Sequence, residues 1–222
     1  MKKGIYIVLI LSILLNIVFV VYGTLRYIST GGYNSDNISY DGNRDKMYKV
    51  LPVDSNDNVF IGDSHIYKYN LHEFFKKPNL KNRGIDGDTS PGLYYRLDDI
   101  LKYNPKAIFI KIGINDIKTG IPADSSSKYL AKIINKIKSN QSVKNFYIIS
   151  MLPVTAVDKN KIIVYNNMLK NICTKMDVTF INAYPHFLVN GKLNEKLNSG
   201  DGLHLSGEGY HLLSSILKPY LR

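Results

Sequence analysis

Three polar residues have the types and the spacing that nucleophilic attack on an acyl group requires. Ser64 closes a Gly-Asp-Ser motif directly after a short apolar segment, while Asp201 and His204 lie three residues apart near the C-terminus. A neutral histidine can accept a serine proton and pass it to a leaving group, and a carboxylate beside it can hold the ring in the required tautomer. Taken singly, Ser64 also fits a helix N-cap and His204 an incidental loop residue. Together they predict a serine nucleophile with a histidine base.

Two further residues are candidate donors to the negative charge that such a reaction creates. Asn115 follows an apolar segment in a Gly-Ile-Asn-Asp motif, and Gly87 lies in a polar turn. Attack on a carbonyl carbon builds negative charge on the carbonyl oxygen, and a preorganised N–H donor stabilises that charge by ~3 kcal/mol. Both residue types are also common in turns, so their role depends on where the fold places them relative to Ser64.

The elements that must position these residues follow from the apolar pattern. From about residue 48 onward, short apolar runs alternate with amphipathic segments, which predicts βαβ units and a mainly parallel sheet covered on both faces. Sites form at the carboxyl ends of the strands in such sheets, where Ser64 and Asn115 are expected. The expected strands cover 59–61, 80–85, 107–113, 146–152 and 178–181, and the expected helices cover 71–75, 93–101, 129–137, 160–176 and 212–220.

Four segments, in this order, resemble the motif blocks of the SGNH (GDSL-like) hydrolase superfamily. They are Gly62-Asp63-Ser64, the segment 82–89, Gly113-Ile114-Asn115-Asp116 and Asp201-Gly202-Leu203-His204. The resemblance covers residues 57–221 and is closest to the small single-domain esterases, including the platelet-activating-factor acetylhydrolase-like group. It implies a three-layer α/β/α, flavodoxin-like fold with about five parallel strands, in agreement with the pattern of apolar segments.

The resemblance also implies a role for each matched residue. Ser64 matches the nucleophile, and Asp201 and His204 match the acid and the base of a catalytic triad. The backbone N–H groups of Ser64 and Gly87 and the side chain of Asn115 match the oxyanion hole. The family needs no metal or organic cofactor, so none is expected here.

Several nearby polar residues need a separate interpretation. His65 follows the nucleophile where the family name expects Leu, and we expect it at a pocket edge or on a helix surface. Asp63, Asp86, Asp88 and Asp116 lie beside glycines, where Asp is common because it bonds its own backbone. They are therefore expected to be turn residues, not metal ligands.

The N-terminal segment is expected to anchor the chain. Lys2 and Lys3 precede an apolar stretch over 4–23, and about 20 residues are long enough to span the ~30 Å hydrocarbon layer of a membrane. We expect an uncleaved transmembrane signal anchor over 4–23 and not a cleaved signal peptide, with residues 1–3 in the cytoplasm. Residues 24–47 are expected to form a flexible stalk and residues 48–222 an extracytoplasmic hydrolase domain.

Charge and cysteine content narrow the choice of partners. The chain has 222 residues and a formal net charge of +11, with its lysines spread along the sequence. This favours general attraction to anionic envelope polymers over nucleic-acid binding. Cys173 is the only cysteine, which excludes a disulfide within the chain and a Cys-rich metal site. Its apolar neighbours at helical spacing predict a core position.

The sequence therefore predicts a membrane-anchored serine esterase that hydrolyses short acyl esters, O-acetyl groups above all, on cell-envelope polysaccharide. Two alternatives use the same triad: a lysophospholipase or other acyl-ester lipase, and an O-acyltransferase that passes the acyl group to a sugar hydroxyl. A non-catalytic envelope-binding module is an alternative of another class. The presence of both a triad and oxyanion donors argues against it, since binding alone needs neither. The oligomeric state is left open.

Overall fold

The computed structural model describes residues 2–29 and 42–221, and the chain divides into two compact units, 1–37 and 38–222. In the first unit the described backbone is the helix α1 (Lys2–Ser29). Side chains of α1 are described for residues 11–22, 24 and 25, and the large apolar ones among them are exposed. Within the residues described, no helix combines the length and the apolar character of a membrane span. Part of the expected anchor, residues 4–10 and 23, lies outside the described side chains.

The interval 24–47, expected as a flexible stalk, contains helical residues at both ends. α1 continues to Ser29, and α2 (Gly42–Val50) begins before the expected domain boundary at residue 48, while residues 30–41 lie outside the described part. Within the second unit, α2 packs against the end of β2, where the buried Tyr48 donates its hydroxyl to the Gly84 carbonyl at 3.0 Å. The Arg83 guanidinium lies 4.9 Å from the centre of the same ring. The polar, glycine-rich composition of residues 24–47 gives no indication of the contact between Tyr48 and Gly84.

Five parallel strands form one sheet in the order β2-β1-β3-β4-β5, as the alternation of segments predicts. The strands are β1 (Asn58–Gly62), β2 (Leu80–Gly84), β3 (Ala107–Lys111), β4 (Asn145–Ile149) and β5 (Thr179–Ile181). Every residue of β1 and β3 is buried, since both strands have neighbours on either side and helices on either face. A second, two-stranded antiparallel sheet joins β6 (Leu188–Val189) and β7 (Lys192–Leu193).

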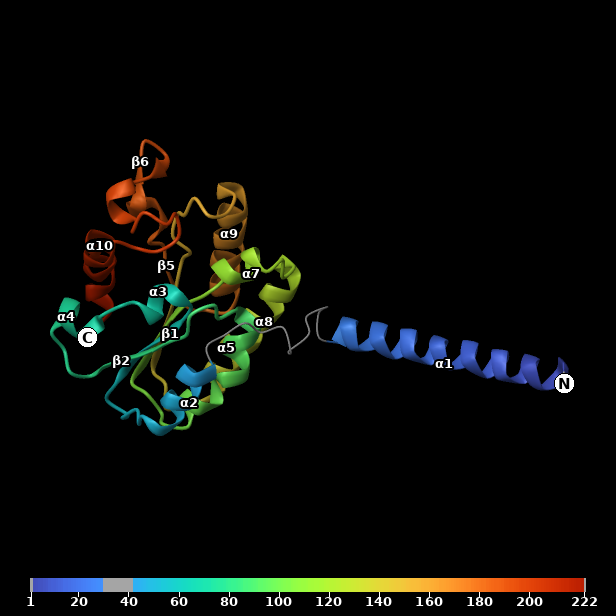
Figure 1. Cartoon of the computed structure of the whole chain (residues 1–222). Helices are drawn as coiled ribbons and strands as arrows, with labels where there is room; N and C mark the ends of the chain where they lie inside the picture. The colour runs from blue at the N-terminus through green and yellow to red at the C-terminus, as the bar shows by residue number, and fades with distance from the viewer. Residues whose placement is uncertain (1, 30–41, 222) are drawn as a thin grey trace. The chain divides into compact units, whose positions relative to one another are not determined.

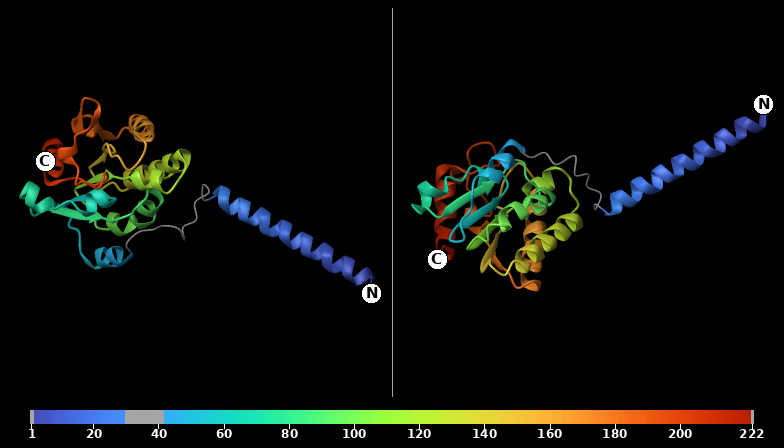
Figure 2. Two further views of the ribbon diagram at one scale, coloured as in Figure 1. Left: turned by 45° about the horizontal axis from the view of Figure 1, so that its top comes forward. Right: turned by 90° about the horizontal axis from the view of Figure 1, so that it is seen from below.

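Helices cover both faces of the five-stranded sheet (Figures 1 and 2). Successive strand residues point to opposite faces, so Ile61 and Ile110 belong to one core cluster while Phe60 and Phe109 belong to the other. Cys173 is buried in the first cluster, as expected. The first face is covered by α5 (Ser90–Arg96), α6 (Asp98–Leu101), α8 (Ala123–Ser139) and α9 (Lys159–Lys175). The second is covered by α3 (Ser64–Tyr67), α4 (Leu71–Phe75) and α10 (Gly207–Leu217).

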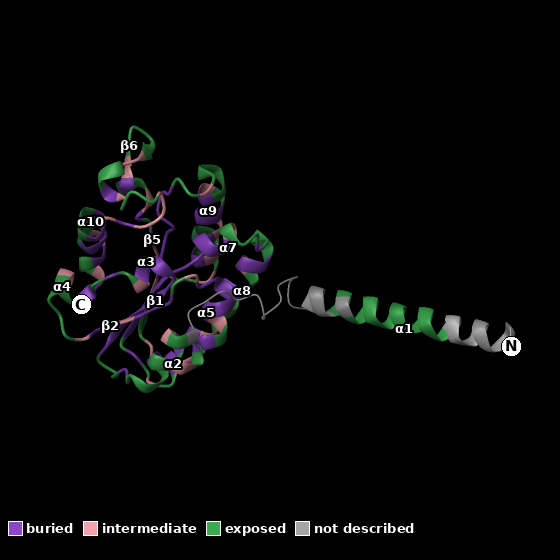
Figure 3. Ribbon diagram, in the orientation of Figure 1, coloured by how far each residue is buried: buried purple, intermediate pink, exposed green. Residues whose placement is uncertain are grey.

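The segments that follow the strands lie together at one end of the sheet, where burial continues beyond the strands themselves (Figure 3). α3 follows β1 directly, and α7 (Ile114–Lys118) follows β3. The long connection from β5 to α10 contains η2 (Tyr184–Phe187), the β6–β7 hairpin and η3 (Glu195–Leu197), and a short turn, η4 (Lys218–Tyr220), follows α10. This connection carries the predicted base His204 back toward the end of β1.

Candidate active site

A forced turn at the end of β1 places Ser64. Gly62 has φ 147°, and a Cβ atom there would lie 1.8 Å from the Lys111 carbonyl oxygen, so the turn requires glycine. Asp63 then caps α3 by accepting the His65 N–H at 3.0 Å. Ser64 is the first residue of α3, where backbone N–H groups have no partner within the helix. The nucleophile predicted from sequence therefore sits on a sharp strand-to-helix turn.

The structure brings Ser64, His204 and Asp201 together although Ser64 and His204 are 140 positions apart in the sequence. His204 Nε2 lies 3.0 Å from Ser64 Oγ, and His204 Nδ1 lies 2.5 Å from Asp201 Oδ2. Because Nδ1 faces a carboxylate, it carries the ring proton, and Nε2 is left to accept the serine proton. Hydrogen bonds from the backbone and ring of His204 lower the pKa of Asp201, which keeps this carboxylate ionised.

The loop that carries the base is held from both sides. Thr155 and Ala156, in the segment after β4, donate their N–H groups to the Gly202 carbonyl at 2.8 and 3.1 Å. The Asn198 side chain donates to the His204 carbonyl at 2.9 Å. Asp201 Oδ1 also accepts the His204 N–H at 2.8 Å, which fixes the carboxylate to the same backbone. These bonds restrict the position of the imidazole before any substrate is present.

The predicted oxyanion donors Gly87 and Asn115 lie in turns that follow the two strands next to β1. Gly87 has φ 75° in the connection from β2 to α5, and Asn115 is buried near the start of α7. The Asn115 amide donates one hydrogen to the Asp88 carbonyl at 2.9 Å, which leaves its second hydrogen for another acceptor. The strands that carry these turns, β2 and β3, both pair with β1. The three predicted donors, Ser64, Gly87 and Asn115, therefore follow three adjacent strands.

A buried ion pair secures the turn that carries Gly87. Arg96 of α5 donates to Asp88 Oδ2 from Nε at 2.9 Å and from a terminal nitrogen at 2.7 Å. It also donates to the carbonyls of Arg83 and Gly62 at 2.8 and 3.3 Å. Burial raises the pKa of Asp88 to about 6, although the Arg96 charge opposes the rise. Arg96 thus joins the turn that carries Asp88 to the end of β1.

Asp116 has an equivalent structural position below Asn115. Its carboxylate accepts the Ser90 N–H at 2.8 Å, the Ser90 hydroxyl at 2.5 Å and the Tyr165 hydroxyl at 2.9 Å. Burial raises the pKa of Asp116, and the hydrogen bonds from Ser90 oppose the rise. Within residues 2–29 and 42–221, no group of three or more His, Cys, Asp or Glu side chains is arranged to hold a metal ion.

His65 occupies a different position from the pocket edge or helix surface that its sequence suggests. It is buried, with 1% of the residue exposed, and its Nε2 lies 2.8 Å from the Leu203 carbonyl oxygen. Its Nδ1 lies 2.5 Å from the Nζ atom of Lys111, which is itself fully buried at the end of β3. Sequence reasoning overlooked Lys111, because a lysine that ends an apolar strand usually extends into solvent.

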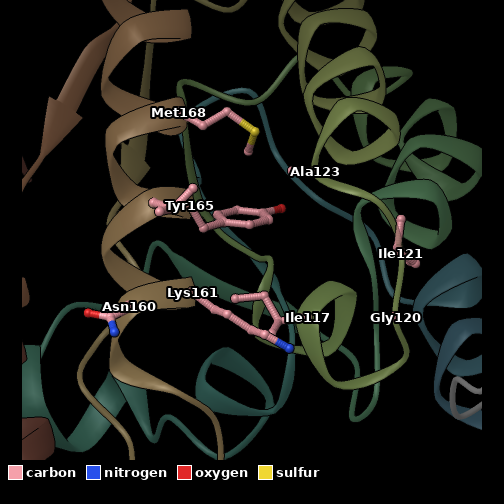
Figure 4. A pocket seen from close by; sticks show the side chains of 9 residues that line it. Ile117, Gly120, Ile121, Ala123, Asn160, Lys161, Tyr165 and Met168 are labelled. Carbon is pink, nitrogen blue, oxygen red and sulfur yellow. The ribbon is translucent and has the colours of Figure 1, made fainter.

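An apolar pocket of ≈ 410 Å³ opens beside α7 and α9 (Figure 4). The Tyr165 hydroxyl in its wall donates to Asp116, the residue that follows Asn115 in the sequence. Its lining consists of Ile117, Gly120, Ile121 and Ala123 on one side and Asn160, Lys161, Val164, Tyr165 and Met168 of α9 on the other.

Comparisons with known proteins agree with this geometry. The sequence profile of the GDSL-like Lipase/Acylhydrolase family matches residues 60–212. A solved structure from Streptococcus pneumonia, provisionally named a platelet activating factor, is 29% identical, with a TM-score of 0.75 over 81% of this chain and 92% of that chain. A GDSL-like lipase structure from Bacteroides thetaiotaomicron is 23% identical, with a TM-score of 0.70 over 79% of this chain and 94% of that chain.

One curated protein shows a different kind of similarity. The N-acylneuraminate cytidylyltransferase of Streptococcus agalactiae serotype III (strain NEM316) is 26% identical over 161 residues, which is 71% of this chain. The match covers only 37% of that protein's own length. The chain thus corresponds to a part of this relative.

Proposed function

Because the chain belongs to the GDSL-like lipase/acylhydrolase family and is an ester hydrolase, we propose that Ser64, His204 and Asp201 hydrolyse acyl esters through an acyl-enzyme. The observation that carries the proposal is the unbroken contact from Asp201 Oδ2 to His204 Nδ1 at 2.5 Å and from His204 Nε2 to Ser64 Oγ at 3.0 Å. This order of groups gives the base its tautomer and the nucleophile its proton acceptor.

In the first half of the reaction, His204 Nε2 takes the hydroxyl proton as Ser64 Oγ attacks the carbonyl carbon of the ester. The resulting oxyanion accepts hydrogen bonds from the N–H groups of Ser64 and Gly87 and from the Asn115 amide. The C–O bond to the leaving alcohol then breaks, and the imidazolium returns its proton to the alcohol oxygen. Asp201 stabilises the imidazolium charge while it exists.

In the second half, a water molecule replaces the alcohol. His204 takes a proton from this water, which attacks the carbonyl carbon of the acyl-Ser64 ester, and the same donors hold the second oxyanion. The bond to Ser64 Oγ breaks and His204 returns the proton to Ser64, so the acid leaves and the enzyme is regenerated. If a sugar hydroxyl took the place of water, the same residues would transfer the acyl group instead.

For the natural substrate we propose short acyl esters, O-acetyl groups above all, on anionic carbohydrate of the cell envelope. Support comes from two observations. The curated relatives from Streptococcus agalactiae, which align with this chain over 161 residues at 25–26% identity, are named for N-acylneuraminate, a carbohydrate. The net charge of +11 suits a polyanionic substrate.

The apolar pocket beside α7 favours a second candidate, a longer acyl chain. Its volume of ≈ 410 Å³ and its lining by Ile117, Ile121 and Met168 suit a hydrocarbon chain better than an acetyl group, which would leave most of it empty. Under this alternative the enzyme is a lysophospholipase or a related acyl-ester lipase.

We also propose that residues 4–23 hold the enzyme in the cell membrane with the hydrolase domain outside. The support is the sequence alone, namely the apolar stretch behind Lys2 and Lys3. Alkaline-washed membranes from cells that express the full chain should retain it, and its release into the wash would contradict the proposal.

Hydrolysis of nitrophenyl esters by the full-length chain in detergent tests the function. The matched variants are Ser64→Ala and Ser142→Ala, which removes an exposed serine far from the triad in sequence. We expect acetate release to exceed octanoate release, and both to vanish in Ser64→Ala alone. Faster octanoate release would favour the second candidate. Equal turnover by wild type and Ser64→Ala would exclude Ser64 as the nucleophile.

A further inference from the structure

Directly behind the nucleophile lies a buried cluster of three ionisable side chains, Asp63, His65 and Lys111, which we call the Lys111 cluster. Each residue is at most 1% exposed. Lys111 Nζ lies 2.5 Å from His65 Nδ1 and 3.7 Å from Asp63 Oδ1. Asp63 and His65 flank Ser64 in the sequence, and Lys111 is the register partner of Gly62 on the neighbouring strand. Buried ionisable groups are costly, so a cluster at this place requires an explanation.

The neighbours of His65 determine its tautomer. Leu203 O, at 2.8 Å from Nε2, is a carbonyl oxygen and accepts only, so Nε2 carries the hydrogen and donates it. Nδ1 therefore holds a lone pair, which accepts a hydrogen from Lys111 Nζ. Burial lowers the pKa of His65 well below its ordinary value, and the Lys111 charge lowers it further. His65 is thus a neutral donor directed at one backbone carbonyl.

The backbone of His65 is fixed as firmly as its ring. Its N–H donates to Asp63 Oδ1 at 3.0 Å, and its carbonyl accepts the Tyr210 hydroxyl of α10 at 3.0 Å. The residue is held at its amide, its carbonyl and both ring nitrogens. Because His65 itself has little freedom to move, a group that it hydrogen-bonds is also held in a defined position.

The carbonyl that His65 holds belongs to the residue directly before the base. The Leu203 carbonyl carbon is bonded to the His204 nitrogen, and His204 Nε2 lies 3.0 Å from Ser64 Oγ. Leu203 and His204 are both only partly buried, in a loop whose Asp201 is exposed. A rigid donor in α3 therefore binds the base-carrying loop at the peptide bond that directly precedes His204.

We propose that His65 is a positioning residue for the ester hydrolysis: held by Lys111 and Asp63, it fixes the Leu203 carbonyl and so sets the imidazole of His204 against Ser64. The inference rests on the proposed roles of Ser64 and His204. It also accounts for the ring's neutrality. The His65 and His204 ring centres are 6.0 Å apart, so a charged His65 would oppose the imidazolium that His204 becomes during the reaction.

Burial is the largest cause of the lowered pKa of His65, and Lys111 and His204 also disfavour a positive charge on the ring. The hydrogen bond to the Leu203 carbonyl and the Asp201 charge act in the opposite direction, and they do not cancel the lowering. Asp63 faces Lys111 as well as His65, at 3.7 Å from both Nζ and Nδ1, and balances the lysine charge.

Two variants and a matched control test the proposal in the full-length chain. His65→Leu removes the donor, His65→Gln offers an amide N–H to Leu203, and His211→Leu removes an exposed histidine of α10. We expect kcat for acetyl ester to fall ~10–100-fold in His65→Leu with KM nearly unchanged, because a displaced catalytic group costs rate and not binding. We expect His65→Gln to recover most of the loss and His211→Leu to match wild type.

Nitrogen-15 NMR of histidine-labelled wild type supplies a readout that does not depend on turnover or on the folding of a variant. We expect the His65 ring to stay neutral, with hydrogen on Nε2, from pH 5 to pH 8. A ring that titrates in this interval, or that carries its hydrogen on Nδ1, would overturn the proposal.

The kinetic outcomes separate this inference from the function on which it rests. If wild type and Ser64→Ala hydrolyse esters equally, the proposed function fails. If only Ser64→Ala is inactive while His65→Leu keeps the wild-type kcat, the function stands and the positioning role is refuted. A folded His65→Gln as slow as His65→Leu would likewise refute the donor role, with folding judged by each variant's unfolding midpoint.

Discussion

Replacing Asn115 by alanine should separate catalysis from stability. The Asn115 amide has two hydrogens, and one of them donates to the Asp88 carbonyl at 2.9 Å. Its loss leaves one buried carbonyl unpaired, which costs about 1–2 kcal/mol of unfolding free energy. In the proposed mechanism the second hydrogen meets the oxyanion only during the reaction. Its loss should raise the activation barrier by about 3–4 kcal/mol, which lowers kcat ~100–1000-fold and leaves KM almost unchanged.

Asn166 is the matched control. It is also a buried asparagine, and it pairs with Met151 twice, accepting its N–H at 2.8 Å and donating to its carbonyl at 3.0 Å. Asn166→Ala therefore strands two backbone groups and should cost about 2–4 kcal/mol of unfolding free energy. It lies outside the proposed oxyanion site, so kcat should remain within about threefold of wild type below the unfolding transition.

The assay combines steady-state hydrolysis of an acetyl ester with urea denaturation of the same preparations. We expect the order of the two variants to differ between the two measurements. Asn115→Ala should lose less unfolding free energy than Asn166→Ala but more kcat. If both variants lose rate in proportion to lost stability, or if Asn115→Ala slows turnover less than about tenfold, the amide is not an oxyanion donor and the reasoning from its free hydrogen fails.

Three further outcomes are expected. Asp201→Asn should lower kcat at least ~100-fold with unchanged circular dichroism, because an amide hydrogen facing Nδ1 forces His204 into the tautomer that cannot accept the serine proton. Gly113→Ala should cost about 2–4 kcal/mol in urea denaturation, since φ is 127° and its Cβ would lie 2.5 Å from the Tyr165 ring. Burial raises the pKa of Asp88 from 3.8 to about 6, so its contribution to stability is complete below pH 4 and is lost as pH rises through 6. The unfolding free energy of wild type, measured against Asp88→Asn, should thus fall by ~3 kcal/mol from pH 4 to pH 7, and a flat difference would refute the burial argument.

The apolar pattern predicts the sheet because burial on both faces leaves a plain signal. The strands expected over 107–113 and 146–152 are found as β3 (Ala107–Lys111) and β4 (Asn145–Ile149), and the C-terminal ends of such runs continue as buried turns. The connection from β5 to α10 gives no such signal. Its hairpin and short 3-10 helices have two to four residues each, too few for a period to be visible.

The predicted site residues follow a similar division. Ser64 and Asn115 could be placed from sequence because each follows a strand, and parallel strands end at the same edge of a sheet. The 3.0 Å contact between His204 and Ser64 could not, since it depends on how a long connection folds back. α2 was concealed for a related reason: its anchoring contact, from Tyr48 to Gly84, joins residues 36 positions apart.

The Lys111 cluster was invisible in sequence because its members meet only through register. Gly62 pairs with Lys111 across β1 and β3, which brings the lysine beside the two residues that flank Ser64. A buried ammonium group then needs the acceptors that Asp63 and His65 supply.

The contributions of His65 and Lys111 to stability must therefore depend on each other. His65→Leu should leave Lys111 short of an acceptor, and Lys111→Met should leave His65 Nδ1 and Asp63 short of a donor. The double variant should lose less unfolding free energy than the sum of the single losses, by about 1–3 kcal/mol in a double-mutant cycle. Strict additivity would mean that the 2.5 Å contact contributes nothing to folding, and that His65 is held by its backbone and by its bond to Leu203 alone.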